Sequence, residues 1–140
     1  MRMIMSHIHP ERSALEALAN LPDGEPVVML NLLRFRREAA YPEGSGHAQC
    51  SGREAYARYG AQAAGHVEAV GGKPIWMGQV QQTVIGPSEE AWDEVLLVQY
   101  PSRKAFLAMA ANPEYLACTV HRTAALADSR LIAMRAGQRR

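Results

Sequence analysis

Two short segments constrain the fold most, because both of their alternating faces are apolar. Val27 to Phe35 has the sequence VVMLNLLRF, and Glu94 to Tyr100 has the sequence EVLLVQY. A strand with this pattern lies in the middle of a sheet that is covered on both sides. The chain must therefore place these two segments centrally and supply both edge strands and two layers of cover.

Helix signals lie between and after these two strands. Ser51 and Glu54 form a capping-box pattern ahead of an apolar stripe that ends before a pair of glycines. Ser102 is a candidate cap for a later helix, and Asn112, followed by proline, starts another helical segment whose stripe runs to Ala127. These signals predict helices on either side of the second apolar strand.

The remaining strands are predicted at the edges. Lys73 to Ile85 alternates like a strand, but its thirteen positions would extend about 40 Å, so a bend or bulge is expected at Gly78. Arg130 to Arg135 is the last predicted strand, and a short amphipathic helix is expected before Pro22. The order predicts an α+β fold, ferredoxin-like βαββαβ with an extra short N-terminal helix, and with the first and third strands central.

Composition is that of an ordinary globular protein. The 140 residues are 48% hydrophobic, which predicts one domain over 1–140 with a loose arm at 1–9 and a basic tail at 136–140. A formal net charge of +1 argues against a nucleic-acid partner, and no apolar run is long enough for a membrane or a signal core. A cytoplasmic location is expected, with Cys50 and Cys118 as reduced thiols and with no metal and no cofactor.

One face of the predicted sheet lacks cover. Apolar residues occur on both sides of the strands, both main helices pack on one side, and the N-terminal helix is too small for the other. A second subunit laid sheet against sheet would cover it, and the strand from Lys73 to Ile85 could reach across to that partner. The chain is therefore predicted to form a homodimer, a dimeric α+β barrel.

Several segments, in this order, resemble the DUF1330 proteins. They are VVMLNLLRF, SGREAYARYG, GPSEEAWDEVLLVQYPSRKAFLAM, and NPEY followed by VHRTAALADSRLIAMR, together spanning about Pro26 to Arg135. The resemblance implies membership of the dimeric α+β barrel superfamily and implies no activity, because the family is named for its unknown function. The wider superfamily includes cofactor-independent monooxygenases, haem proteins, isomerases and lyases, so fold alone selects no reaction.

Polar and aromatic side chains inside the predicted core are the first site candidates. Asn31 interrupts an apolar central strand, so it is either the polar floor of a pocket or the partner in a hydrogen bond within the core. Tyr56, Tyr59, Trp76 and Tyr115 could line an apolar cleft with hydroxyl groups; the alternative is that they only fill the core.

Charged candidates follow on the last helix and the first strand. His121 could act as a general base, and Arg122 or Arg34 could hold a carboxylate. The alternative is a surface histidine beside an arginine in a salt bridge. His47 and Cys50 share the long irregular loop 36–51, a possible lid or a mere insertion, but no third group orients them as a nucleophilic pair.

These observations favour a homodimer with a small, mostly apolar cleft that binds a small organic acid or an aromatic metabolite. If the protein is an enzyme, a cofactor-independent reaction is expected, with His121 or a tyrosine as acid or base. The alternative is a non-catalytic binding or interaction protein, in which the same residues pack the core.

Overall fold

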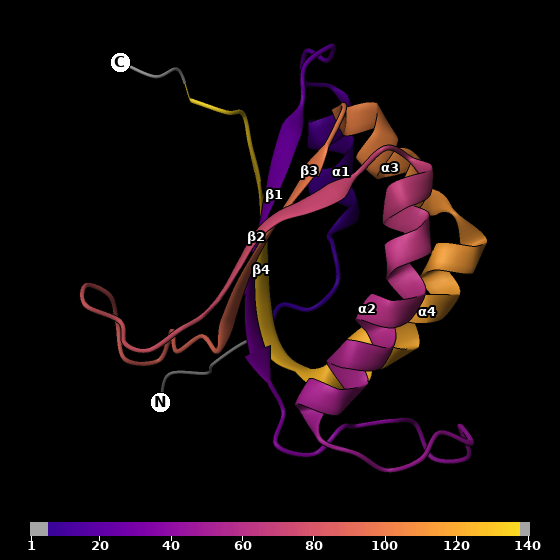
Figure 1. The fold of residues 1–140 in the computed structure, drawn as a ribbon, viewed down its shortest axis with the longest axis vertical. Coiled ribbons are helices and arrows are strands. Elements are labelled where there is room, and N and C mark those ends of the chain that lie inside the picture. The colour runs from indigo at the N-terminus through magenta and orange to yellow at the C-terminus, as the bar shows by residue number, and fades with distance from the viewer. Residues whose placement is uncertain (1–5, 138–140) are drawn as a thin grey trace.

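The computed structural model describes residues 6–137 and forms one four-stranded antiparallel sheet with helices on one face (Figure 1). The strand order is β2-β3-β1-β4. This confirms the predicted ferredoxin-like arrangement and the central place of the two strands that are apolar on both faces. The elements are α1 (Arg12–Ala19), β1 (Val27–Phe35), α2 (Gly52–Ala69), β2 (Lys73–Gln79), β3 (Glu94–Tyr100), α3 (Arg103–Ala111), α4 (Pro113–Ala125) and β4 (Leu126–Met134).

The helix caps form as their sequence patterns predict. The Ser51 hydroxyl accepts a hydrogen bond from the Glu54 backbone at 3.1 Å, and the Glu54 carboxylate accepts one from the Ser51 backbone at 3.0 Å. Asn112 caps α4 through the Glu114 backbone N–H at 2.8 Å. Helix α2 ends ahead of Gly71, whose φ of 82° is a left-handed conformation that favours glycine.

Strand β4 begins earlier than the predicted Arg130, directly at the end of α4. Its first residue, Leu126, pairs with Phe35, and Ser129 pairs with Leu33. Asp128 and Ser129 are typical of turns, yet both are buried within this strand. Their polar groups are satisfied there by the N-terminal arm: the His7 backbone N–H donates to Asp128 at 2.8 Å, and the Ser129 hydroxyl donates to the His7 carbonyl at 2.6 Å.

The expectation of a loose arm at 1–9 is therefore wrong at His7 and Ile8. The Ile8 carbonyl accepts a hydrogen bond from Arg122. Residues 1–5 of that arm, and residues 138–140 of the predicted basic tail, lie outside the described residues. No helix within residues 6–137 is both long and apolar enough to span a bilayer.

Strand β2 is shorter than the predicted 73–85. It ends at Gln79, and its irregularity lies between Pro74 and Trp76 rather than at Gly78. The chain then leaves the sheet as an arm, residues 80–93, that projects from the body of the molecule (Figure 1). Val84 and Ile85 on this arm are almost fully exposed.

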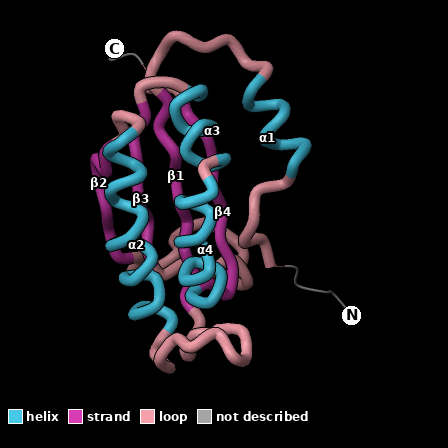
Figure 2. Tube along the Cα trace, turned by 90° about the vertical axis from the view of Figure 1, so that its right-hand side faces the viewer, coloured by secondary structure: helices cyan, strands magenta, loops and turns pink. Residues whose placement is uncertain are grey.

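The two faces of the sheet have different surroundings. Helices α2, α3 and α4 lie over one face (Figure 2), where Val27, Met29 and Leu33 of β1 are buried. Leu30 of β1 faces the opposite way and pairs with Leu97 and Ile132 in the two neighbouring strands. No helix of the described chain covers this opposite face, which we call the open face.

Candidate ligand site between the sheet and the helices

A row of residues crosses the helix-covered face of the sheet from edge to edge. The register places Met77 of β2 beside Leu96 of β3, Leu96 beside Asn31 of β1, and Asn31 beside Leu131 of β4. Directly paired residues share a face, and Asn31 lies two residues from Leu33, which faces the helices. We call these four residues the transverse row.

The transverse row is accessible although it lies on the covered face. Its ends, Met77 and Leu131, are 64% and 42% exposed, and its central members are half-buried. On either side of Asn31 along β1, Met29 is 2% and Leu33 is 0% exposed, and these two residues belong to separate core clusters. A more exposed band at the row therefore separates the two core clusters along β1.

The floor of this band carries polar groups. The Asn31 side-chain amide donates to the Leu96 carbonyl at 3.2 Å and to the Met29 carbonyl at 3.4 Å, the core hydrogen bond that was the alternative prediction. Glu94 and Ser129 lie beside the band, in the next row of the sheet, where both pair with Leu33 and so face the helices too. Burial raises the pKa of the Glu94 carboxyl, although Arg53 opposes this shift.

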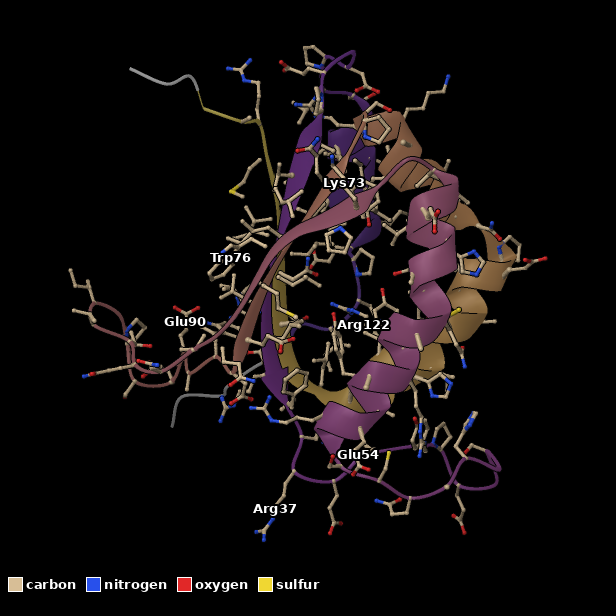
Figure 3. The ribbon with its side chains drawn as sticks, viewed as in Figure 1. Arg37, Glu54, Lys73, Trp76, Glu90 and Arg122 are labelled. Atoms are coloured by element: carbon tan, nitrogen blue, oxygen red, sulfur yellow. The ribbon has the colours of Figure 1, made fainter. Side chains whose placement is uncertain are left out.

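Three tyrosines and an arginine face this floor from the helices. Tyr56 and Tyr59 come from α2, and Tyr115 comes from α4. The hydroxyls of Tyr59 and Tyr115 lie 2.8 Å apart, and the rings of Tyr56 and Tyr59 are 5.3 Å apart. Arg122 of α4 extends into the space between the sheet and α2 (Figure 3), where its guanidinium also donates to Ser129 at 3.4 Å.

The electrostatics make this group a set of hydrogen-bond donors. Burial raises the pKa of Tyr56 to about 12, with Arg122 opposing the shift and Glu94 adding to it. Burial also raises the pKa of Tyr59, as does its neighbour Tyr115. Both hydroxyls therefore keep their protons at neutral pH. Among residues 6–137, Arg122 forms no ion pair with a carboxylate, and its guanidinium donates to the Ile8 carbonyl and to the Ser129 hydroxyl.

Four of the eight predicted site residues thus come together. Tyr56, Tyr59, Tyr115 and Arg122 lie close to one another between the sheet and the helices, whereas Asn31 lies in the transverse row and its amide donates to backbone carbonyls of the sheet. Arg34 and Trp76 face the other way: Arg34 follows Leu33 along β1, and Trp76 pairs with Leu97 on the open face. A separate depression of about 360 Å³ lies at the end of β4, between Glu25 and residues 135–137.

His121 belongs to a second group, which we call the loop cluster: Tyr41, His47, Arg58, Gln62 and His121. The His121 side chain is 4% exposed, so the alternative of a surface histidine in a salt bridge is wrong. Its Nδ1 lies 2.7 Å from the Tyr41 hydroxyl, and its Nε2 lies 3.2 Å from the Gln62 amide. Burial lowers the pKa of His121, and His47 and Arg58 lower it further.

Four participants were missed by sequence reasoning: Glu94 of β3, and Tyr41, Arg58 and Gln62 of the loop cluster. Side chains alternate between the two faces of a strand, so Glu94 lies on the same face as Leu96 and Val98. This alternation could have placed Glu94 on the face toward the helices. Tyr41 lies in an irregular loop where no period exists, so nothing local indicated it. The His47 ring lies 4.9 Å from the Tyr41 ring and contacts His121 as well. No group of three or more metal-binding side chains gathers within residues 6–137.

Comparison with known proteins identifies relatives whose function is also unknown. The model of the family described as "Domain of unknown function (DUF1330)" matches residues 46–136. The crystal structure of methylated RPA0582 protein is 42% identical, with a TM-score of 0.86 over 96% of this chain and 98% of that chain. The RPA0582 protein of unknown function from Rhodopseudomonas palustris is 40% identical, with a TM-score of 0.87 over 96% of this chain and 100% of that chain.

A more distant structure shares the fold alone. It is a dimeric protein of unknown function with a ferredoxin-like fold from Bacteroides fragilis, 12% identical, with a TM-score of 0.50 over 78% of this chain and 94% of that chain. No curated protein matches the chain in sequence.

Proposed function

The chain belongs to the DUF1330 family, and from the geometry of its own site we propose that it is a homodimer that binds a small organic acid at the transverse row. The observation that carries the proposal is the half-open band at Asn31 and Leu96, between two closed core clusters. A filled core would bury the centre of a central strand as completely as its flanks.

The side chains around the row match the two parts of such a ligand. Arg122 supplies a cation for a carboxylate, and the hydroxyls of Tyr56 and Tyr59 supply neutral donors. Leu96 and Leu131 supply apolar surface for the organic body. Small-molecule sites commonly combine a mostly apolar lining with a few polar groups that fix orientation.

The dimer is proposed from the open face. Leu30, Leu97 and Ile132 lie side by side there with no helix of residues 6–137 over them, and the 57% exposed Trp76 extends this apolar surface. A second copy laid against this face would bury these side chains, and the projecting arm at 80–93 is placed to contact it. The Bacteroides fragilis protein that shares the fold is described as dimeric.

If the protein is an enzyme, we propose a cofactor-independent reaction in which His121 acts through Tyr41. Both ring nitrogens of His121 face protein groups, so a proton could reach a ligand only by way of the Tyr41 hydroxyl. The binding proposal does not depend on this step.

Calorimetric titration with benzoate, and with benzamide as its uncharged counterpart, tests the binding proposal. Benzoate is expected to bind at least about tenfold more tightly than benzamide, because a hydrogen bond to a charged group contributes about 1.5 to 3 kcal/mol. Arg122→Gln is expected to remove this preference. Arg34→Gln is the matched control, since Arg34 lies on the open face, and it should leave binding unchanged.

A second variant guards against a folding defect, because Arg122 also holds the N-terminal arm. Tyr59→Phe removes only the hydroxyl contact with Tyr115 and should weaken benzoate binding severalfold in a folded protein. Equal binding by wild type, Arg122→Gln and Tyr59→Phe would overturn the proposal. No binding of either compound by folded wild-type protein would also overturn it and favour a protein without a small-molecule site.

A further inference from the structure

The loop at 36–51 is held against α2 and α4 by hydrogen bonds in series. Arg58 Nη1 on α2 donates to the Tyr41 hydroxyl at 3.1 Å, and that hydroxyl lies 2.7 Å from His121 Nδ1 on α4. The series returns to α2 through the contact of 3.2 Å between His121 Nε2 and the Gln62 amide. Tyr41 is therefore the loop side chain that joins the loop to both helices.

The contacts of His121 favour one arrangement of protons. The Gln62 amide nitrogen can only donate, so His121 Nε2 accepts from it and is unprotonated. The ring proton then lies on Nδ1 and is donated to the Tyr41 hydroxyl oxygen, which also accepts from the Arg58 guanidinium. The series is therefore complete only while His121 is neutral.

The loop covers the end of one core cluster. Ala39 is buried against Leu33 and Leu126, and the Ala40 backbone N–H donates to the Ala124 carbonyl at 2.8 Å. Arg58 also donates to the carbonyl of Ala48 at 3.0 Å. The Arg36 backbone N–H also donates to the Ala125 carbonyl at 2.8 Å, so the two parts of the loop differ: residues 36–40 are held by the backbone of α4, and Tyr41, His47 and Ala48 are held through the loop cluster.

We propose that the loop at 36–51 is a pH-sensitive strap, closed over the core while His121 is neutral and released when His121 gains a proton. This inference stands independently of the proposed ligand. A second proton on His121 would lie on Nε2 and point at the Gln62 amide nitrogen, which is itself a donor. It would also place a positive charge beside Arg58 and beside the His47 ring, whose centroid is 4.7 Å from that of His121.

The groups that face His121 all oppose its charge or are neutral. They are Tyr41 and His47 from the loop and Arg58 and Gln62 from α2; on α4 itself, Cys118 lies one turn earlier. The lowered pKa of His121 has the same direction. The open form, with an ordinary histidine pKa of about 6.5, binds more protons, so closure weakens as pH falls from about 6.5 through the lowered value.

An NMR titration of the full chain from about pH 8 to about pH 5 tests the strap. The ¹⁵N shifts of the His121 ring should report a neutral Nδ1–H tautomer at the upper end and a pKa below about 6.5. Amide protection in residues 39–50, corrected for intrinsic exchange, should fall at least about tenfold at the same midpoint. A loop whose protection does not change while His121 titrates would overturn the proposal.

Three variants assign the effect to the series. Tyr41→Phe should lower loop protection near neutral pH and remove its pH dependence, and His121→Gln should remove the pH dependence as well. His66→Gln is the control, because the His66 ring contacts Tyr115 rather than the loop, and it should keep the transition. Persistence of the transition in Tyr41→Phe would overturn the proposal. Loss of the transition in His47→Gln would also overturn it, because His47 would then be the titrating group.

Discussion

The two faces of the sheet differ in the polarity of their central side chains and in whether helices cover them. The covered face carries polar side chains, with Asn31 in the middle of β1 and Glu94 at the start of β3. The open face carries the apolar Leu30 and Leu97 at its centre, with no helix of residues 6–137 over them. Polar side chains beneath the helices favour a small ligand on the covered face. Apolar side chains on the open face favour a second copy of the chain there.

The largest expected effect compares neighbours on opposite faces of β1. Leu33→Ala opens a cavity in a completely buried site and should lower the free energy of unfolding by about 2 to 5 kcal/mol at any protein concentration. Leu32→Ala, on the open face, should cost roughly 1 kcal/mol in dilute protein and more in concentrated protein, as the dimer forms. Urea denaturation at two concentrations measures both. A loss of stability in Leu32→Ala that does not depend on protein concentration would contradict the predicted difference between the two faces.

The next effect concerns the open face alone. Leu30→Asp places a charge in the middle of the proposed dimer interface and should weaken dimerisation by at least about 100-fold, or roughly 2.7 kcal/mol. Light scattering over a dilution series measures the change. Leu116→Asp is the control, because Leu116 is exposed on α4, and it should leave the mass unchanged. An unchanged mass in Leu30→Asp would place the interface elsewhere.

A smaller effect is expected at β4, where the N-terminal arm binds. Burial alone would raise the pKa of Asp128, but hydrogen bonds from His7, Ser129 and Arg130 outweigh it and lower the pKa. A carboxyl with a lowered pKa stabilises the fold above its unfolded value of about 3.9 and loses that contribution as pH falls through the folded value. Between about pH 5 and about pH 2, wild type should lose roughly 1 kcal/mol more stability than Asp128→Asn. Parallel pH profiles of the two proteins would contradict this.

The smallest expected effect on stability concerns Asn31 on the covered face. Asn31→Leu removes two hydrogen bonds but adds apolar surface, so the free energy of unfolding should change by less than about 1 kcal/mol. If the row is a ligand site, benzoate binding should nevertheless be lost. A gain in stability of several kcal/mol with unchanged binding would mean that Asn31 is only a flaw in a packed core.

Sequence reasoning succeeded where local pattern alone determines structure. The apolar runs of β1 and β3 placed them centrally, and the capping box at Ser51 fixed the start of α2. It failed where a distant partner decides. The alternation of residues 73–85 continues past Gln79, but Gln79 pairs with Glu94, the first residue of β3, and after a backbone hydrogen bond of 2.9 Å from Val80 to Asp93 the chain forms a loop.

The same division applies to the candidate site. Tyr56, Tyr59 and Tyr115 could be grouped because helix periodicity sends them to the same side. Arg34 was predicted to lie at the same site as the tyrosines, and this was wrong. Arg34 follows Leu33 along β1, so the alternation of side chains already placed it on the opposite face. Tyr41 reaches His121 from eighty residues away along the chain, and no local signal in a loop records such a contact.

A crystal structure of the protein grown with benzoate tests the central claim most directly. The account predicts a carboxylate within hydrogen-bonding distance of the Arg122 guanidinium, with the benzoate ring between Leu96 and the tyrosines, and a second copy on the open face. A transverse row closed by protein side chains, with no ligand between the sheet and the helices, would contradict it.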